Sequence, residues 1–169
     1  MKVIITGATG MIGKGVLLEC LDHPEITEVL TLGRNLTGIS HNKLRESIHT
    51  DFSDFTRIKD LLVGYDACYY CMGVSAAGMN EMEYTRLTYD FTLALAKVLH
   101  QINPSMTFIY VSGEGTDSTE KGRMMWARVK GKTENDLMQV GFKQVFAFRP
   151  GAIIPLRGIK SKTKSYQFM

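Results

Sequence analysis

Short apolar runs alternate along the chain with longer stretches in which apolar residues recur at helical spacing. The run Val3-Ile4-Ile5 is continuous rather than alternating, which is typical of a strand covered on both faces. TFIYV at 107–111 and VFAF at 145–148 have the same character. We therefore predict strands at residues 3–5, 28–32, 44–49, 67–71, 107–111 and 145–148.

Helical spacing marks the stretches between these runs. Ile12, Val16 and Cys20 recur every fourth residue, and the helix that they predict stops at His23-Pro24, because the residue before a proline disfavours helical backbone. Further helices are predicted at 53–62, 80–102 and 124–140. On the long helix of 80–102, the side chains expected to be buried are Leu87, Phe91, Ala94, Leu95 and Val98.

This rhythm of strands and helices indicates the fold class. Strands that alternate with helices imply βαβ crossovers, and therefore an α/β protein with a doubly wound parallel sheet between two layers of helices. No internal repeat and no linker precede about residue 155. We expect one domain over residues 1–155, followed at 156–169 by either a basic tail or the truncated start of a further lobe.

A glycine motif lies between the first strand and the first helix. TGATGMIG contains Gly7, Gly10 and Gly13 as GxxGxxG, which suits a tight turn, a close approach of a pyrophosphate and close packing of the helix on the sheet. The helix N-terminus offers free N–H groups to an anion, with Thr9, Met11 and Ile12 beside it. The alternative is that the glycines serve only the turn.

The end of the second strand predicts which dinucleotide binds. An acidic residue there would accept a hydrogen bond from a ribose 2′-hydroxyl and indicate NAD, but the chain has Gly33-Arg34-Asn35. Arg34 can bind a 2′-phosphate, so NADP is favoured over NAD; the alternative is a surface arginine. Asp51 and Phe52 are candidates to bracket the adenine, although Asp51 could equally cap a helix.

Five segments carry a resemblance to a known family: TGATGMIG (6–13), GYDACYYCMG (64–73), FIYVSG (108–113), WARVKGKTE (126–134) and FRPG (148–151). These segments follow one another in the family's order and are spread over nearly the whole chain. The chain therefore resembles the extended and atypical short-chain dehydrogenase/reductase superfamily, which includes NAD-dependent epimerase/dehydratase-like proteins. Within that superfamily it resembles the TAT-interacting oxidoreductase-like branch. The resemblance implies a Rossmann fold with strand order 3-2-1-4-5-6, here with the substrate lobe largely missing.

The resemblance also implies a catalytic pair, Tyr-x-x-x-Lys, on the helix after the fifth strand. Lys130 occupies the lysine position, but Trp126 replaces the tyrosine, and an indole N–H can donate a hydrogen bond without exchanging a proton. The family's serine or threonine corresponds to Ser112 or to Gly113. Trp126 could instead be core filler.

Further roles follow from the same resemblance. Thr88 stands where extended members have an asparagine, and a loop acid, Glu114, Asp117 or Glu120, could act as the base. Additional contacts with the cofactor are expected from the ends of the later strands, at Cys71, Met72, Gly73, Val111, Pro150 and Gly151.

The resemblance implies an NADP-dependent oxidoreductase or epimerase-like protein that transfers a hydride to or from a carbonyl or alcohol substrate. The alternative is a non-catalytic NADP(H)-binding regulator or redox sensor that acts through protein partners. A homodimer is a further expectation.

Composition changes this picture little. Three cysteines, an odd number, together with the absence of a signal sequence, favour a reducing compartment, and we expect a cytoplasmic protein without a transmembrane segment. Cys68 and Cys71 form a CxxC, which we interpret as two buried strand cysteines rather than a redox pair. The four histidines lack ligand spacing, so no metal site is expected.

The net charge of +3 arises from a few residues near the end of the chain. Arg157, Lys160, Lys162 and Lys164 stand in a stretch without an acidic residue, and the remainder is close to neutral. A solvated basic tail is therefore favoured over a nucleic-acid or other polyanion partner.

Overall fold

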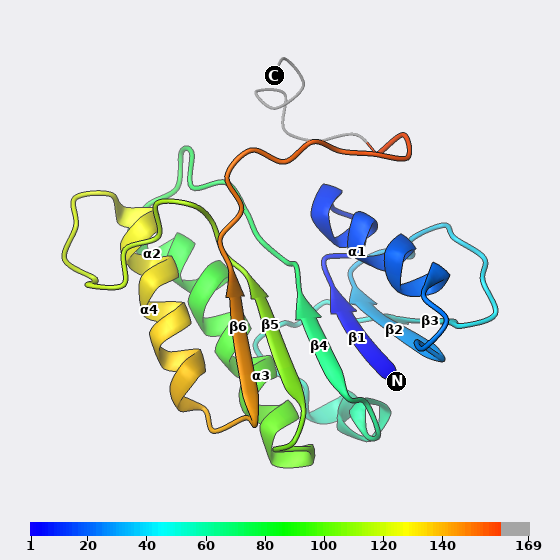
Figure 1. The fold of residues 1–169 in the computed structure, drawn as a ribbon. Coiled ribbons are helices and arrows are strands. Elements are labelled where there is room, and N and C mark those ends of the chain that lie inside the picture. The colour runs from blue at the N-terminus through cyan, green and yellow to red at the C-terminus, as the bar shows by residue number, and fades with distance from the viewer. Residues whose placement is uncertain (160–169) are drawn as a thin grey trace.

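The computed structural model describes residues 1–159 and contains a single parallel sheet of six strands (Figure 1). The strand order is β3-β2-β1-β4-β5-β6, and every neighbouring pair is parallel, which confirms the predicted fold class and order. The strands are β1 (Lys2–Thr6), β2 (Glu28–Gly33), β3 (Leu44–Ile48), β4 (Ala67–Tyr70), β5 (Thr107–Val111) and β6 (Gln144–Phe148).

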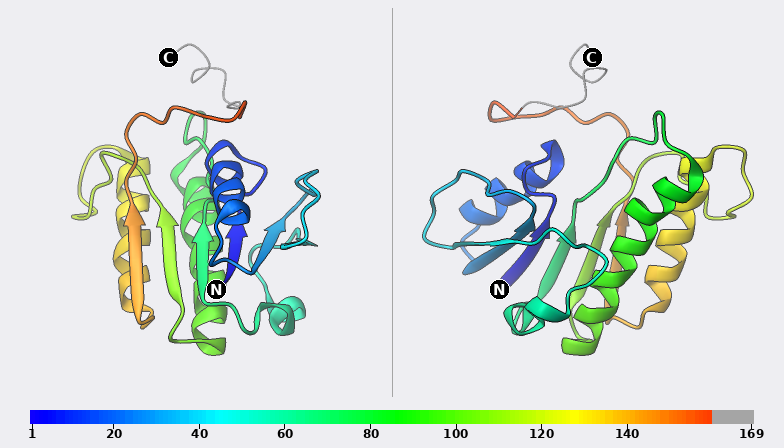
Figure 2. Two further views of the ribbon diagram at one scale, coloured as in Figure 1. Left: turned by 45° about the vertical axis from the view of Figure 1, so that its right-hand side comes forward. Right: turned by 180° about the vertical axis from the view of Figure 1, so that it is seen from behind.

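Helices cover both faces of this sheet. Helix α1 lies on one face, while α3 and α4 lie on the other, as the view from behind shows (Figure 2). The helical elements are α1 (Met11–Asp22), the 3-10 helix η1 (Thr56–Leu62), α2 (Glu81–Thr85), the π-helical turn η2 (Arg86–Asp90), α3 (Phe91–Ile102) and α4 (Met125–Gln139).

Alternation along β1 divides the core into two layers. Val3, Ile4 and Ile5 are all fully buried, as their continuous apolar run predicts. Val3 and Ile5 pack with Leu17 of α1, whereas Ile4 belongs to the larger cluster on the opposite face with residues of α3 and α4. Successive side chains of a strand point to opposite faces, so one short run supplies both layers.

The long helix predicted at 80–102 is continuous but not regular. Asn80 caps its start by accepting a hydrogen bond from the backbone N–H of Glu83 at 2.9 Å, and η2 inserts a π-helical turn before α3. Of the side chains predicted to be buried, only Leu95 is fully so. The others, Leu87, Phe91, Ala94 and Val98, are partly exposed. The further buried positions are Tyr84, Thr88, Thr92, Leu93, Ala96 and Leu99.

The π turn explains this correction. A π turn holds more residues than an α turn, so it rotates the helix that follows relative to the regular pattern that the sequence prediction assumes. Tyr84 before η2, Thr88 within it and Thr92 after it are all buried.

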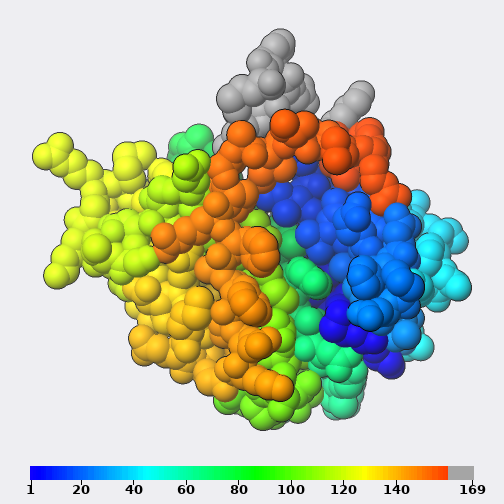
Figure 3. All heavy atoms as spheres, viewed as in Figure 1, coloured from blue at the N-terminus to red at the C-terminus, as the bar shows by residue number. Residues whose placement is uncertain are grey.

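The segment after β6 crosses the carboxyl edge of the sheet toward α1 (Figure 1). Arg157 forms ion pairs there with Glu19 at 3.5 Å and Asp22 at 2.8 Å. Of the predicted basic tail, Lys160, Lys162 and Lys164 lie outside the described residues. The outer strand β6 is visible on the surface in Figure 3, and Phe146 and Phe148 are exposed on it.

None of the helices in residues 1–159 is long and apolar enough to cross a membrane. Within the same residues, no group of three or more His, Cys, Asp or Glu side chains could hold a metal ion.

Cys68 lies inside β4 and is fully buried, while Cys71 follows the strand and is partly buried. Burial raises the pKa of both thiols, that of Cys71 to about 12. Because thiolate is the reactive form of cysteine, this environment favours the interpretation as structural cysteines.

Candidate functional site

The first βα turn is built from main-chain contacts that only glycine allows. Gly7 has a φ of +69°, and a Cβ placed there would lie 2.7 Å from the main-chain carbon and oxygen of Cys71. A Cβ at Gly13 would overlap the carbonyl oxygen of Gly7. The end of β1 therefore touches the end of β4 on one side and the first turn of α1 on the other.

The start of α1 leaves backbone donors free for an anion. Gly10 is the N-cap residue, and no side chain caps the helix. The N–H of Gly10 itself donates to the carbonyl of Gly7 at 2.9 Å. The amides of Met11, Ile12 and Gly13 are thus left at the positive end of the helix dipole, which is an arrangement that binds phosphate.

A hollow of about 70 Å³ adjoins this turn. It brings together many of the residues predicted to bind a cofactor, from the ends of β1, β2 and β4. The lining residues are Gly7, Ala8, Thr9, Thr31, Leu32, Gly33, Arg34, Asn35, Thr37, Phe52 and Met72. The turn and the hollow together place free backbone N–H groups beside a cavity that is lined from the ends of three strands.

Asp51 does not line the hollow, although its neighbour Phe52 does. The Asp51 carboxylate accepts hydrogen bonds from the backbone N–H of Ser53 at 3.0 Å and from the Ser53 hydroxyl. The Ser53 hydroxyl is the main cause that holds the pKa of Asp51 below its usual value. The helix-cap alternative is wrong, because η1 begins after Phe55; Asp51 instead stabilises the turn before it.

Arg34 is exposed at the edge of the hollow and, among residues 1–159, has no carboxylate within ion-pair distance. Nearby lies an acidic residue that the sequence reasoning missed. Glu46 of β3 accepts hydrogen bonds from the Thr31 hydroxyl at 3.2 Å and from the Thr37 N–H at 2.8 Å. Only the register of β2 and β3, which pairs Thr31 with Glu46, reveals its place.

A second group of predicted residues gathers where β5 and β6 end. The N–H of Ser112 donates to the carbonyl of Phe148 at 2.7 Å, and the N–H of Glu114 donates to Pro150 at 2.9 Å. These bonds extend the pairing of the two strands beyond Val111 and set Pro150-Gly151 beside Ser112. Gly73 follows β4 in open surroundings, and a Cβ there would meet no atom within 4 Å.

Ser112 is buried, and its hydroxyl oxygen lies 3.0 Å from that of Thr116. The Thr116 hydroxyl donates to the carbonyl of Gly113 at 2.7 Å, so its proton is already committed. Ser112 must therefore be the donor toward Thr116. It keeps lone pairs free to accept a hydrogen bond but would have to rotate before donating to a substrate.

Trp126 is partly exposed at the start of α4 and belongs to neither cluster of buried apolar side chains within the described residues. Its ring lies against Gly115, where an added Cβ would be 3.4 Å away. This placement beside the loop that follows β5 favours a surface role over core filling.

One turn further along α4, the amine of Lys130 approaches the buried Tyr110, lying 3.5 Å from the phenol oxygen and 5.2 Å from the ring centre. Burial lowers the pKa of Lys130 to about 8, and the charge of Glu134 opposes part of that change. Lys130 is thus a partly desolvated cation without an ion pair among residues 1–159.

The loop between β5 and α4 is tied to the helix. Asp117 donates its N–H to the carbonyl of Ala127 at 3.1 Å, and Asn135 donates to the carbonyl of Ser118 at 3.0 Å and to the Glu120 carboxylate at 2.7 Å. Asp117 also accepts from the Thr119 hydroxyl at 2.6 Å, which holds its pKa below the usual value. Two of the three proposed loop bases therefore already accept hydrogen bonds, Asp117 from within the loop and Glu120 from α4, while Glu114 remains exposed.

Arg149 fastens the same loop to β6. Its guanidinium binds the buried carboxylate of Glu134 through two nitrogens and donates to the Ser118 hydroxyl at 2.6 Å. The hydrogen bonds that Arg149 donates to the Glu134 carboxylate raise the pKa of Arg149. This pair links the end of β6, the middle of α4 and the loop.

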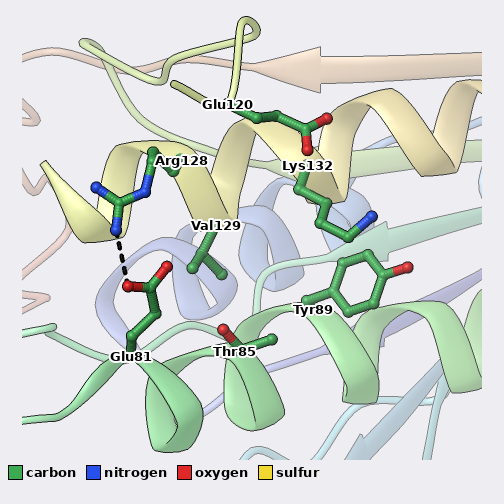
Figure 4. Close-up of a pocket in the computed structure, with 7 residues that line it drawn as sticks. All are labelled: Glu81, Thr85, Tyr89, Glu120, Arg128, Val129 and Lys132. Carbon is green, nitrogen blue, oxygen red and sulfur yellow. Dashed lines mark hydrogen bonds and ion pairs between the residues drawn. The ribbon is translucent and has the colours of Figure 1, made fainter. Parts of the chain in front are cut away.

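A separate hollow of about 140 Å³ opens between α2–η2 and α4 (Figure 4). It is lined by Glu81, Thr85, Tyr89, Glu120, Arg128, Val129 and Lys132, and includes none of the residues predicted to bind the cofactor. Arg128 is paired with Glu81 at 2.7 Å, and Lys132 is paired with Asp136 at 2.9 Å. Its basic groups are already neutralised, so the glycine turn is the better candidate site.

The chain is similar to known proteins over most of its described length. The model of the NAD dependent epimerase/dehydratase family matches residues 3–120. Protein FMP52 of Candida albicans, named as mitochondrial, is 27% identical over 158 residues, which cover 91% of this chain and 68% of that protein. Protein HTATIP2 of Rattus norvegicus is 24% identical over 156 residues, covering 90% and 63%.

Solved structures share the fold. UDP-glucuronic acid 4-epimerase from Bacillus cereus, in complex with NAD, matches with a TM-score of 0.71 and 18% identity. The match covers 90% of this chain and 57% of the epimerase chain. The Bordetella bronchiseptica enzyme WbmH, in complex with NAD⁺, has a TM-score of 0.71 and 15% identity, covering 95% and 58%. The chain thus spans about two thirds of the length of these two relatives and somewhat over half of the length of the two enzyme chains of known structure.

The relatives contradict the predicted cytoplasmic location. Those from Candida albicans, Emericella nidulans and Saccharomyces cerevisiae are all named as mitochondrial proteins. The prediction is wrong because cysteine usage reports the redox state of a compartment and does not distinguish one reducing compartment from another.

The close contact between the loop after β5 and Gly131 of α4 predicts the effect of replacing this glycine. A Cβ at Gly131 would overlap the carbonyl of Asp117, so G131A should lower the free energy of unfolding by about 1–3 kcal/mol. Urea unfolding measures this change. The matched control is G15A in α1, where the nearest atom would be 3.8 Å away and alanine should be neutral or stabilising. Equal effects of the two substitutions would contradict the described contact.

The lowered pKa of Lys130 predicts that this residue makes the folded protein less stable near neutral pH. Between pH 8 and 10.5 the unfolded chain holds a proton that the folded chain has released, so the free energy of unfolding rises with pH over that range. K130M should therefore be more stable than the wild type at pH 7, by about 1 kcal/mol after allowing for partial exposure, and this difference should shrink toward pH 10.

Thermal unfolding at the two pH values tests this expectation. K132M on the same helix is the control, because hydrogen bonding to Asp136 raises the pKa of Lys132, so that variant loses a favourable surface pair at pH 7. A K130M protein that is less stable than the wild type at pH 7 would contradict the described environment of Lys130.

Proposed function

Because this chain belongs to the NAD dependent epimerase/dehydratase family, we propose that it binds a nicotinamide dinucleotide at the first βα turn and prefers the 2′-phosphorylated form. The observation that carries this proposal is the joining of two features at one edge of the sheet. The uncapped start of α1 offers backbone N–H groups to a diphosphate, and Arg34 extends beside the adjoining hollow without a carboxylate partner in residues 1–159.

The rest of the cofactor would lie along the carboxyl edge of the sheet. Cys71, Met72 and Gly73 follow β4, Val111 ends β5 with Ser112 directly after it, and Pro150-Gly151 come after β6. This row leads from the adenosine hollow toward α4, where Lys130 would donate to the hydroxyls of the nicotinamide ribose. When bound, the dinucleotide supplies or accepts a hydride.

The residues around that position set what the chain itself can contribute to hydride transfer with a carbonyl or alcohol substrate. Trp126 would orient a substrate oxygen through its indole N–H, and Ser112 would accept or, after rotation, donate a hydrogen bond. Neither group delivers a proton as a tyrosine does. The loss of a positioned general acid costs about 10²–10⁴ in rate, so we expect slow turnover.

A second function is supported by the same observations. Asp117 and Glu120 are engaged by loop and helix groups, which leaves the exposed Glu114 as the remaining loop acid. A protein with a cofactor site and little proton-transfer capacity suits a regulator that responds to NADP(H) and acts through protein partners. A carbonyl or alcohol substrate and a homodimer are part of the same proposal.

Calorimetric titration with NADPH and NADH tests the cofactor proposal. R34A should weaken the binding of NADPH by about tenfold or more, since a charge-assisted pair with the phosphate is lost, and should leave NADH nearly unchanged. R57A removes an exposed arginine of η1 as a matched control and should alter neither affinity. NADPH binding that is insensitive to R34A would contradict the assigned preference.

The two functions separate in W126Y. If the site is otherwise complete, tyrosine beside Lys130 should raise NADPH-dependent turnover of a panel of aldehydes and ketones at least tenfold over the wild type. W126F, which has the ring of tyrosine without its hydroxyl, should give no increase. Tight NADPH binding with no turnover in the wild type or W126Y would reject the oxidoreductase in favour of the regulator.

A further inference from the structure

Glu46 is a partly buried carboxylate to which neither the sequence motifs nor the proposed chemistry assigns a role. It lies on β3 directly beside Thr31 of β2 in the parallel register. A single carboxylate oxygen accepts both the Thr31 hydroxyl at 3.2 Å and the Thr37 N–H at 2.8 Å. Both donors line the hollow that we assign to adenosine.

These two hydrogen bonds close the turn that displays Arg34. Thr31 precedes the turn within β2, and Thr37 ends it, so the Glu46 carboxylate joins its two sides. Thr37 is held further by its hydroxyl, which accepts from the N–H of Ile39 at 3.3 Å. With the turn fixed in this way, the arginine is held at the mouth of the hollow rather than free to swing with a mobile loop.

The charge of Glu46 acts in the opposite direction. Glu46 has no basic partner within ion-pair distance among residues 1–159, and its donors are a hydroxyl and an amide, so its negative charge is not neutralised. A 2′-phosphate bound by Arg34 would lie near an uncompensated carboxylate, whereas a 2′-hydroxyl carries no charge to repel.

We propose that Glu46 is the residue that positions the Arg34 turn and limits the preference for a 2′-phosphate over a 2′-hydroxyl. The inference rests on the proposed dinucleotide function. The Glu46 side chain then has two separable effects. Its acceptor oxygen holds the turn that either dinucleotide needs, and its negative charge weakens the binding of the 2′-phosphorylated dinucleotide alone.

Two substitutions separate these effects. E46Q keeps a carbonyl oxygen for Thr31 and Thr37 but removes the charge, so the affinity for NADPH should rise about 3–10-fold while that for NADH changes less than about twofold. E46A removes the acceptor as well and should weaken both dinucleotides, because two donors are left unpaired and the turn is no longer held. E25Q removes an exposed charge elsewhere and serves as the control.

Calorimetry with NADPH and with NADH, on the wild type and on the three variants, measures eight affinities, and circular dichroism shows that each variant is folded. A NADPH-to-NADH preference in E46Q equal to that of the wild type, or an E46A protein that binds both dinucleotides as the wild type does, would overturn the assignment of Glu46. A wild type that binds neither dinucleotide would instead overturn the proposed function, and this inference with it.

Discussion

The close contact of three main-chain segments at the first βα turn underlies the rest of this structure. Gly7 turns the chain so tightly that its carbonyl meets Gly13 of α1 while its own Cα lies against the backbone of Cys71. A side chain at Gly13 would push α1 away from the turn, and one at Gly7 would push the turn away from the backbone that follows β4. The turn holds uncapped backbone amides at the carboxyl ends of β1 and β4, where the strand order reverses. Ligands of open parallel sheets bind at this position.

The other half of the site depends on a second close approach, between the loop after β5 and helix α4. Gly131 leaves room for the carbonyl of Asp117, and Arg149 ties the loop to Glu134 of α4. Trp126 and Lys130 are thereby held on one face of a helix that is anchored on both sides. The two residues keep the four-residue spacing of the tyrosine–lysine pair that the resemblance implies, and in the proposed site a titratable tyrosine hydroxyl is absent. Under that proposal, cofactor binding and proton transfer are separate properties of the protein.

Most of the fold could be predicted from the sequence because its signals are local. Continuous apolar runs, the glycine motif and the His23-Pro24 stop each act over a few residues, and the observed strands follow them. The π turn at Arg86–Asp90 could not be predicted, since it changes the helical period that the prediction assumes. Glu46 was missed for a different reason: its contact with Thr31 depends on the register of two strands, and its contact with Thr37 on the path of a loop. Asp51 shows the same limit, because its carboxylate accepts hydrogen bonds from Ser53 in the turn before η1 rather than capping that helix.

The central claim is that backbone N–H groups of the first βα turn bind the diphosphate of a nicotinamide dinucleotide. The most direct measurement is a titration of the ¹⁵N-labelled protein with NADPH, followed through the amide resonances. The account predicts that the largest shifts occur at Gly10, Met11, Ile12 and Gly13, with smaller ones at Gly33 and Arg34. Shifts confined to the hollow between α2 and α4, or no shifts at millimolar NADPH, would contradict it.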